Sequence, residues 1–168
     1  MSSLFGDWNK LGEVLNSSRL KSELSAASAE VGNYGVSEIK KGIVSGKNFA
    51  PNHPYTIAKK GSSKPLIDKG DLLGSVTYDV FNQNSVFIGV KKESGTANIA
   101  AVHEFGCTIK VTPKMRAYLH YNGLHLKDST QYVNIPARSF IRPVLEDMEF
   151  RRVIYNIYRF AVSEALRP

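Results

Sequence analysis

The hydrophobic positions divide the chain into a helical beginning, an alternating middle and a helical end. Leu20, Leu24, Ala27 and Val31 recur every three or four residues, the spacing of one face of a helix. Similar spacing on either side extends the pattern, and it predicts one or two amphipathic helices in an N-terminal helical region, residues 1–45.

Two local features modify this helical region. Asn16-Ser17-Ser18 are residues that cap helices, so a helix is expected to break or begin there. Gly32 and Gly35 weaken the following turns, but the apolar stripe continues past them.

Residues 46–75 are expected to form an extended loop. Pro51, Pro54 and Pro65 disfavour helix, and the glycines of this stretch permit turns. A single helical turn is expected at Asp71–Ser75, with Asp71 as its cap. Loops of this length are uncommon in compact domains and often carry function.

Residues 76–135 are predicted to form an antiparallel sheet with a short helix. Val76–Phe81 and Val86–Val90 alternate between apolar and polar positions around a turn of Asn82-Gln83-Asn84, which indicates a half-buried hairpin. The short helix is expected at Ile99–Phe105, closed by Gly106 in a left-handed cap.

A second hairpin is predicted after this short helix. Its strands would be Cys107–Val111 and Met115–Tyr121, joined around Thr112-Pro113, and Gln131–Ile135 would form the last strand.

The chain ends in a predicted long helix, residues 143–166, with Pro143 as its first residue. It carries two apolar stripes, of which one can pack on the sheet. The other needs a second helix or a neighbouring subunit. The expected fold is therefore α+β: a single domain, 1–168, in which a small antiparallel β-sheet is flanked by an N-terminal helix (or two) and a long C-terminal helix.

The composition excludes several classes of protein but does not indicate a function. The chain has 168 residues and a net charge of +7, and its one cysteine, Cys107, excludes a disulfide framework within the chain. No stretch approaches the roughly 20 apolar residues of a membrane span, and the N-terminus lacks the features of a signal peptide. We therefore expect a basic protein of a reducing compartment that has no membrane partner.

The positive charge is concentrated in two loop-rich segments. Residues 47–70 carry five lysines against one aspartate, and residues 107–142 carry six basic side chains against one aspartate. These segments could contact nucleic acid or an acidic partner, or could simply be solvated. The candidates for a DNA channel or partner-docking surface are Lys47, Lys59, Lys60, Lys64, Lys110, Lys114, Arg116 and Lys127.

Catalytic and metal-binding patterns are weak. His120 and His125 are five residues apart, which suits neither a helical ligand pair nor a zincin motif. His103 could pair with Cys107 as base and nucleophile, but a small buried thiol at the start of a strand is far commoner. The sequence predicts no enzyme, no metal and no cofactor.

Three groups of segments, in a fixed order, resemble a known family. They are Pro51–Thr56 with Pro65–Val76, then Phe87–Val90 with Ile99–Gly106, and last Ile135–Pro143. They are similar to the "Pro-Leu-Ile, then Gly-x-Leu", "Ile-Gly", "Ala-x-x-His-x-Phe-Gly" and "Pro-Ala-Arg-x-Phe" patterns of the tail-completion and virion-morphogenesis (neck) proteins of tailed bacteriophages.

The residues that carry this resemblance also have structural readings. Phe105 is expected to bury the short helix, and Leu66 and Leu72 to anchor the long loop. Arg138 and Arg142 are expected to bind main-chain carbonyls or partner carboxylates. The motif positions are Pro65, Leu66, Gly70, Leu72, Gly89, His103, Phe105, Gly106, Pro136, Ala137, Arg138, Phe140 and Pro143.

The resemblance implies a structural protein of the virion, assembled in the host cytoplasm. Its copies would form a ring, expected to be hexameric, at the neck between head and tail. The partners would be head-connector or adaptor proteins and tail tube or tail terminator proteins, with non-specific contact to packaged DNA. The alternatives are a tail terminator that caps the tail tube and, in another class, a basic nucleic-acid-binding protein.

Overall fold

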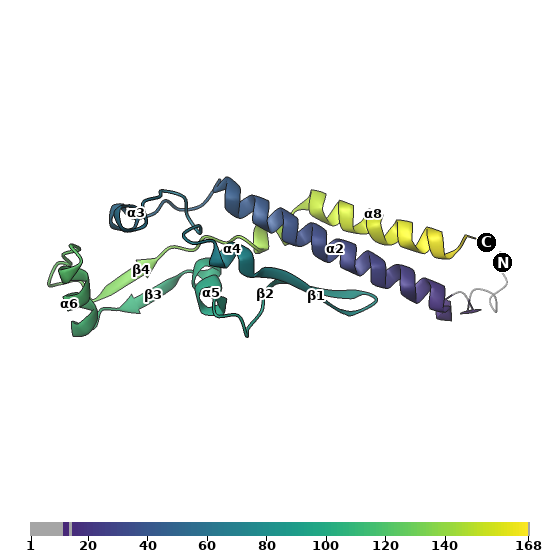
Figure 1. Cartoon of the computed structure of the whole chain (residues 1–168), viewed down its shortest axis with the longest axis horizontal. Coiled ribbons are helices and arrows are strands. Elements are labelled where there is room, and N and C mark those ends of the chain that lie inside the picture. Colours follow the sequence, from purple (N-terminus) through teal and green to yellow (C-terminus); the bar gives the residue numbers. More distant parts are fainter. Residues whose placement is uncertain (1–11, 14, 168) are drawn as a thin grey trace, which may run out of the picture. The chain divides into compact units, whose positions relative to one another are not determined.

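The computed structural model describes residues 12–13 and 15–167, and it confirms the α+β class (Figure 1). The described contacts group into two compact units. Unit 1 combines the described residues up to Glu38 with Thr77–Gly89 and with the chain from Leu145 on; unit 2 combines Ile39–Val76 with Val90–Val144. The single domain stays a prediction, and the N-terminal helical region before residue 12 lies outside the described residues.

Unit 1 is built on the long helix α2, Ser18–Ser45, whose last turns belong to unit 2. The expected break at Asn16–Ser18 is confirmed, because Ser17 Oγ accepts a hydrogen bond from Leu20 N–H at 3.1 Å and so caps the helix. Hairpin β1–β2, Val76–Asn82 with Ser85–Val90, also forms where the alternation predicted it.

The buried hydroxyl of Ser28 ties these elements together within unit 1. Ser28 Oγ donates to the Gln83 carbonyl in the hairpin turn at 2.8 Å, and it lies 2.8 Å from the Tyr158 hydroxyl of helix α8. Tyr34 of α2 stacks on Phe150 of α8 with 5.4 Å between ring centroids. Helix α8 therefore packs along α2, as Figure 1 shows.

The glycines of α2 explain how closely the hairpin approaches. A Cβ atom on Gly32 would lie 2.2 Å from Tyr78 Cδ2, and one on Gly35 would lie 2.6 Å from Ile88 Cδ1. A side chain at either position would push β1–β2 off the helix. The two residues that weaken the helix locally are thus required by packing.

We expect opposite effects from two alanine substitutions in α2. Gly32→Ala should lower the free energy of unfolding by about 1–2 kcal/mol, because the ring of Tyr78 must move. Gly42→Ala should raise it by about 0.5–1 kcal/mol, because nothing lies near its Cβ and alanine favours helix. Urea denaturation of both variants checks this; a gain at Gly32 would contradict the close approach.

The C-terminal helix is interrupted, contrary to the prediction of one helix over 143–166. Helix α7 spans Arg142–Glu146, and α8 spans Met148–Ala165. Asp147 separates them, since its carboxylate accepts hydrogen bonds from Glu149 N–H at 2.7 Å and Phe150 N–H at 3.0 Å. An aspartate that caps a new helix cannot also continue the preceding one.

Unit 2 contains the loop-rich segments, and two expectations about it are wrong. Residues 46–75 are not wholly extended ahead of Asp71, because they hold helix α3, Pro54–Lys60. The helical turn expected at Asp71–Ser75 is confirmed as helix α4, but its cap is Gly70 rather than Asp71. Pro54 sits in the first turn of α3, where its missing N–H costs nothing.

The second hairpin pairs differently from the prediction. Strand β3, Cys107–Lys110, pairs antiparallel with β4, Tyr132–Ile135, so the strands form two two-stranded sheets. The stretch expected as the returning strand is helix α6, Pro113–Tyr121. Thr112 caps it through a hydrogen bond from Met115 N–H at 3.1 Å, so Thr-Pro marks a helix start. Helix α5, Ala97–Phe105, is confirmed.

Each unit has its own core. In unit 1, Leu20, Ala27 and Val31 of α2 are buried together with the α8 residues Phe150 and Ala161. In unit 2 the buried apolar residues are Ile39, Ile43, Leu72, Val76, Ala100 and Phe140. None of the helices in the described part of the chain has the length and apolarity of a membrane span.

Candidate functional site

The resembling segments of unit 2 meet around one buried cation, Arg138. Its side chain is 7% exposed. Its Nε donates to the Ala50 carbonyl at 2.7 Å and its Nη2 to the Pro51 carbonyl at 3.0 Å, while its backbone N–H donates to the His103 carbonyl at 2.6 Å. The expectation that Arg138 binds main-chain carbonyls is confirmed. A guanidinium suits this position because its donors form a rigid fork.

Glu104 forms a second junction beside the first. Its Oε1 accepts hydrogen bonds from Ser139 Oγ at 2.5 Å and Arg142 N–H at 3.1 Å. Its Oε2 accepts from Phe140 N–H at 2.9 Å and Ile141 N–H at 3.1 Å. One carboxylate thus satisfies four donors in the turn that precedes α7. Burial raises the pKa of Glu104, but these hydrogen bonds outweigh it and lower the pKa below its usual value.

His103 belongs to the first junction through its carbonyl, and its side chain is half-buried. Burial, followed by the charges of Arg138 and Lys60, lowers the pKa of its imidazole. Within the described part of the chain, its buried Nδ1 atom has no hydrogen-bond partner. A charged ring here would face two cations, so the site favours the neutral imidazole.

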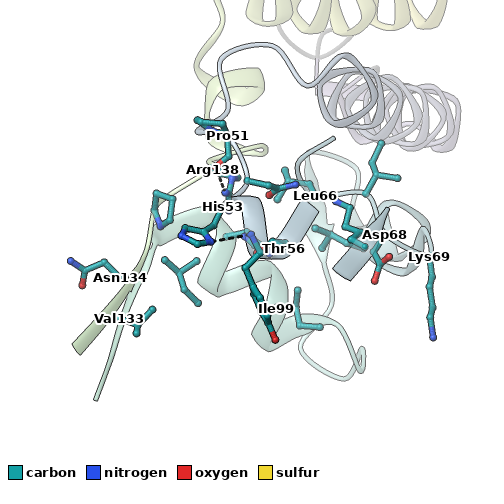
Figure 2. Close-up of a pocket in the computed structure, with 18 of the residues that line it drawn as sticks. Pro51, His53, Thr56, Leu66, Asp68, Lys69, Ile99, Val133, Asn134 and Arg138 are labelled. Carbon is teal, nitrogen blue, oxygen red and sulfur yellow. Dashed lines mark hydrogen bonds between the residues drawn. The ribbon is translucent and has the colours of Figure 1, made fainter. Parts of the chain in front are cut away.

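A cavity of about 1200 Å³ opens in unit 2 in front of these residues (Figure 2). Its walls are mainly apolar, with Ile99 of α5, Leu119 of α6 and Val133 of β4 among them. The loop segments Pro51–Thr56 and Leu66–Leu72 line it as well, together with His103 and Arg138. Figure 2 shows Arg138 beside Pro51, while Lys69 extends away from the other labelled side chains.

Leu66 on the cavity wall adopts an unusual backbone conformation. Its φ is +60°, and Ile67 N–H donates to the Pro65 carbonyl around it at 2.8 Å. A left-handed leucine costs about 1–3 kcal/mol, so the surrounding contacts must hold it. The loop therefore adopts one specific conformation at the cavity wall.

Two further motif residues are placed differently from the prediction. Phe105 does not bury the short helix: it is 68% exposed, with the guanidinium carbon of Arg142 5.8 Å from its ring centroid. Gly106 has φ +75° and ψ 167°, so it is no left-handed cap. A Cβ atom there would lie 3.1 Å from Ala137 N and from Ile135 O, which requires glycine.

The remaining motif positions fit structural roles. Phe140 is buried, Gly70 has φ +93°, and Pro143 lies in α7 after Arg142 rather than at its first residue. Gly89 belongs to unit 1, whereas the other motif positions belong to unit 2. Glu104 escaped the sequence analysis because nothing in its local pattern marks the distant backbone that it binds.

The eight candidate docking cations fall into two groups, all in unit 2. Arg116 is engaged in folding, because its guanidinium donates to the carbonyls of Leu126, Lys127 and Thr130 at 2.6–3.3 Å. Lys59 donates to Asn122 Oδ1 at 2.5 Å, and Lys60 donates to the Lys64 carbonyl. Lys59 is exposed despite this contact, and so are the five remaining side chains: Lys47, Lys64, Lys110, Lys114 and Lys127.

Within residues 12–13 and 15–167, no group of three or more His, Cys, Asp or Glu side chains could hold a metal ion. Arg138, on the cavity wall, is engaged with main-chain carbonyls, and Glu104 is engaged with main-chain N–H groups. The arrangement can hold loops together and receive apolar side chains.

The pKa shifts predict a stepwise loss of stability in acid. Unfolded His103 takes up a proton near pH 6.5 and folded His103 only at lower pH, so the free energy of unfolding should fall as pH drops below about 6.5. A second loss, from Glu104, should begin below about pH 4.5.

Urea denaturation between about pH 3 and 7.5 measures both losses. His103→Gln should remove only the loss of stability below about pH 6.5. Glu104→Gln should remove only the loss below about pH 4.5. The matched control is His125→Gln, because the ring of His125 is exposed and contacts the ring of His120. Equal slopes in the His103→Gln variant and the unsubstituted protein would contradict the assignment.

Comparison of the chain with protein-family models, with curated proteins and with solved structures finds no significant match.

Proposed function

We propose that this chain is a structural virion protein whose copies form a ring, a hexamer, at the neck of a tailed bacteriophage, where it joins the head connector to the tail. It works by recognition and not by catalysis. The proposal rests on the resemblance of the quoted segments to tail-completion and neck proteins, and on how those segments are used within unit 2.

One observation carries the proposal: resembling segments far apart in sequence are hydrogen-bonded to one another. Arg138 joins the third segment to the Pro51 carbonyl of the first, to the carbonyl of Ala50 just before it, and to His103 of the second. Glu104 then joins the second segment to the third. Their joint order along the chain therefore has a physical reason, since they build one junction that positions the loops.

Exposed apolar side chains supply surfaces for assembly. In unit 2, Phe105, Tyr118, Tyr121 and Tyr132 are more than half exposed, and Tyr121 is 90% exposed. Phe81 is 70% exposed near the turn of β1–β2 in unit 1. Exposed apolar groups of this kind favour contacts with other proteins. The two-stranded sheets also leave strand edges that a neighbouring subunit could pair with.

Fewer basic side chains are free to contact packaged DNA than the eight that the sequence suggested. The Arg116 guanidinium is engaged with main-chain carbonyls, and Lys60 donates to the Lys64 carbonyl, so the exposed lysines of this set carry any such contact. Such contacts are non-specific and weaken steeply with salt.

Electron microscopy of phage particles that lack this chain tests the proposal. DNA-filled heads and separate tails that fail to join are the expected result, and the purified chain should form rings alone or on its connector. Normal joined particles without the chain would overturn the proposal. Copurification with finished tails that lack heads would indicate a tail terminator, and salt-dependent duplex binding by a monomer would indicate a nucleic-acid-binding protein.

A further inference from the structure

Strand β4 has one edge that no described strand covers. It pairs with β3 alone, so the opposite edge of each strand in this sheet is open. Val111 N–H donates to the Gln131 carbonyl at 2.8 Å, which marks a hydrogen-bonded pair at the end of the ladder. Because such pairs alternate along antiparallel strands, the register places Thr108 and Asn134 opposite each other in a pair without backbone hydrogen bonds. The backbone N–H and C=O of Asn134 therefore point away from β3.

The cavity of unit 2 follows this open edge. Four consecutive residues of this stretch line it: Val133, Asn134, Ile135 and Pro136. Figure 2 labels two of them, Val133 and Asn134. Side chains of successive strand residues point to opposite faces of a sheet, so a cavity that touches all four follows the edge and not a single face. Among the described residues, no group outside the sheet binds the backbone of Asn134. The edge thus offers one donor and one acceptor to an occupant.

The same cavity holds a buried positive charge that lacks a negative partner. Arg138 is 7% exposed and lies on the cavity wall. Its Nε and Nη2 atoms are bound to carbonyls. Within residues 12–13 and 15–167, its Nη1 atom has no hydrogen-bond partner and its guanidinium has no carboxylate partner. A carboxylate that enters the cavity would therefore gain a charge-assisted hydrogen bond here.

The size of the cavity suits a chain segment better than a small molecule. Its volume of about 1200 Å³ exceeds the roughly 300–1,000 Å³ that is usual for drug-sized ligands. Asn134 and Arg138 are four positions apart, so their Cα atoms lie at most roughly 14 Å from each other. An extended segment of about five residues spans that distance. Half-buried leucines such as Leu119 and Leu126 line the cavity and can receive its alternate side chains.

We propose that this cavity receives an extended segment of a partner protein, which pairs with the open edge of β4 at Asn134, packs aliphatic side chains on the apolar walls and sets one aspartate or glutamate carboxylate against Arg138. In such sites the backbone pairing supplies affinity, and the pockets for alternate side chains supply specificity. The site goes beyond the proposed ring, because it assigns the kind of segment that unit 2 binds and does not depend on how copies assemble.

Charge favours an acidic segment of another protein over a second copy of unit 2. Unit 2 has 15 lysines and arginines against 5 aspartates and glutamates. Two such units repel each other, whereas a segment with an acidic residue is attracted to unit 2. The occupant also protects a strand edge that is otherwise open to unwanted pairing.

Peptide binding to the purified full chain tests the proposal. The probes are fluorophore-labelled, amidated heptapeptides with glutamate at the centre and varied aliphatic or threonine residues elsewhere. Fluorescence anisotropy should show saturable binding by members of this set. Matched peptides with glutamine or lysine at the centre should bind at least tenfold more weakly. No saturable binding by the glutamate set, or equal binding by the lysine set, would overturn the proposal.

Two proline substitutions test where the peptide pairs. Asn134→Pro removes the outward N–H of the β4 edge and leaves the hydrogen bonds to β3 in place. The dissociation constant of the tightest glutamate peptide should then rise at least tenfold. Thr108→Pro is the matched control, since it removes the outward N–H at the same register from the opposite edge of the sheet, outside the cavity. An equal rise in both variants would overturn pairing with β4.

Methylation of the peptide backbone repeats this test on the unsubstituted protein, so it does not depend on how the proline variants fold. An added strand bonds through alternate residues, so methylating the nitrogens of one alternate set should abolish binding and methylating the other set should not. Equal effects of the two sets would overturn strand pairing.

Analytical ultracentrifugation distinguishes the two kinds of occupant. The chain should not self-associate through the cavity, so the glutamate peptide should leave its sedimentation unchanged apart from the added mass. Self-association that the peptide abolishes would show that a second copy fills the cavity, and would overturn the assignment to a partner protein. All these measurements report on the cavity of the purified chain, so they can fail while the neck ring stands, and the reverse.

Discussion

Replacement of Glu104 by glutamine is expected to lower the free energy of unfolding by about 3 kcal/mol, because an amide cannot accept the hydrogen bonds of four donors. One oxygen becomes an NH₂ group, which then faces backbone N–H groups. For a chain of this length the midpoint of thermal unfolding should fall by roughly 6–12 °C. Thermal and urea denaturation measure the loss.

The matched control is Glu93→Gln, which makes the same chemical change at an exposed position of unit 2. Its effect should stay within about 0.5 kcal/mol. A loss at Glu104 no larger than that at Glu93 would show that the turn before α7 does not depend on the carboxylate. The loss at Glu104 should also shrink towards pH 4, where the carboxylate of the unsubstituted protein begins to lose its advantage.

Replacement of Arg138 by methionine is expected to cost about 2–3 kcal/mol, and replacement by lysine nearly as much. Methionine leaves the carbonyls of Ala50 and Pro51 without their donors. Lysine keeps the charge, but a single ammonium cannot reproduce the rigid fork of the guanidinium. The segment around Ala50 should then open more often.

Limited trypsin digestion measures that local opening. Lys47 is exposed and lies three residues before Ala50, so cleavage after Lys47 should become roughly tenfold faster in both Arg138 variants. Arg142→Met is the control, because this exposed arginine contacts only the Phe105 ring among the described side-chain interactions, and its loss should cost less than about 1 kcal/mol. Equal cleavage rates in the Arg138 and Arg142 variants would contradict the tether.

Local patterns predicted the elements whose signals are short-range. The alternation around Asn82–Asn84 predicted β1–β2, and Ser17 predicted the start of α2, because strand faces and helix caps involve residues that are close in sequence. The same local chemistry was misread at Thr112-Pro113. A cap followed by proline was taken for a turn between strands, although it begins α6.

Local sequence patterns could not predict the contacts between segments that are distant in sequence. Nothing near Glu104 indicates that its carboxylate binds the backbone of residues 140–142, and nothing near Gly32 indicates that Tyr78 fills the space of its missing side chain. The partner of β3 was missed for the same reason, since β4 lies beyond a helix and a loop.

The sequence by itself determined the α+β class and the positions of α2, α5 and β1–β2. These features depend on periodicity, capping and composition, which are properties of neighbouring residues. Only the tertiary structure decided that the strands form two separate sheets, that Arg138 and Glu104 join the resembling segments, and which basic side chains remain exposed. Those outcomes depend on which backbone groups of distant segments need a hydrogen-bond partner, and such segments come together only in the folded chain.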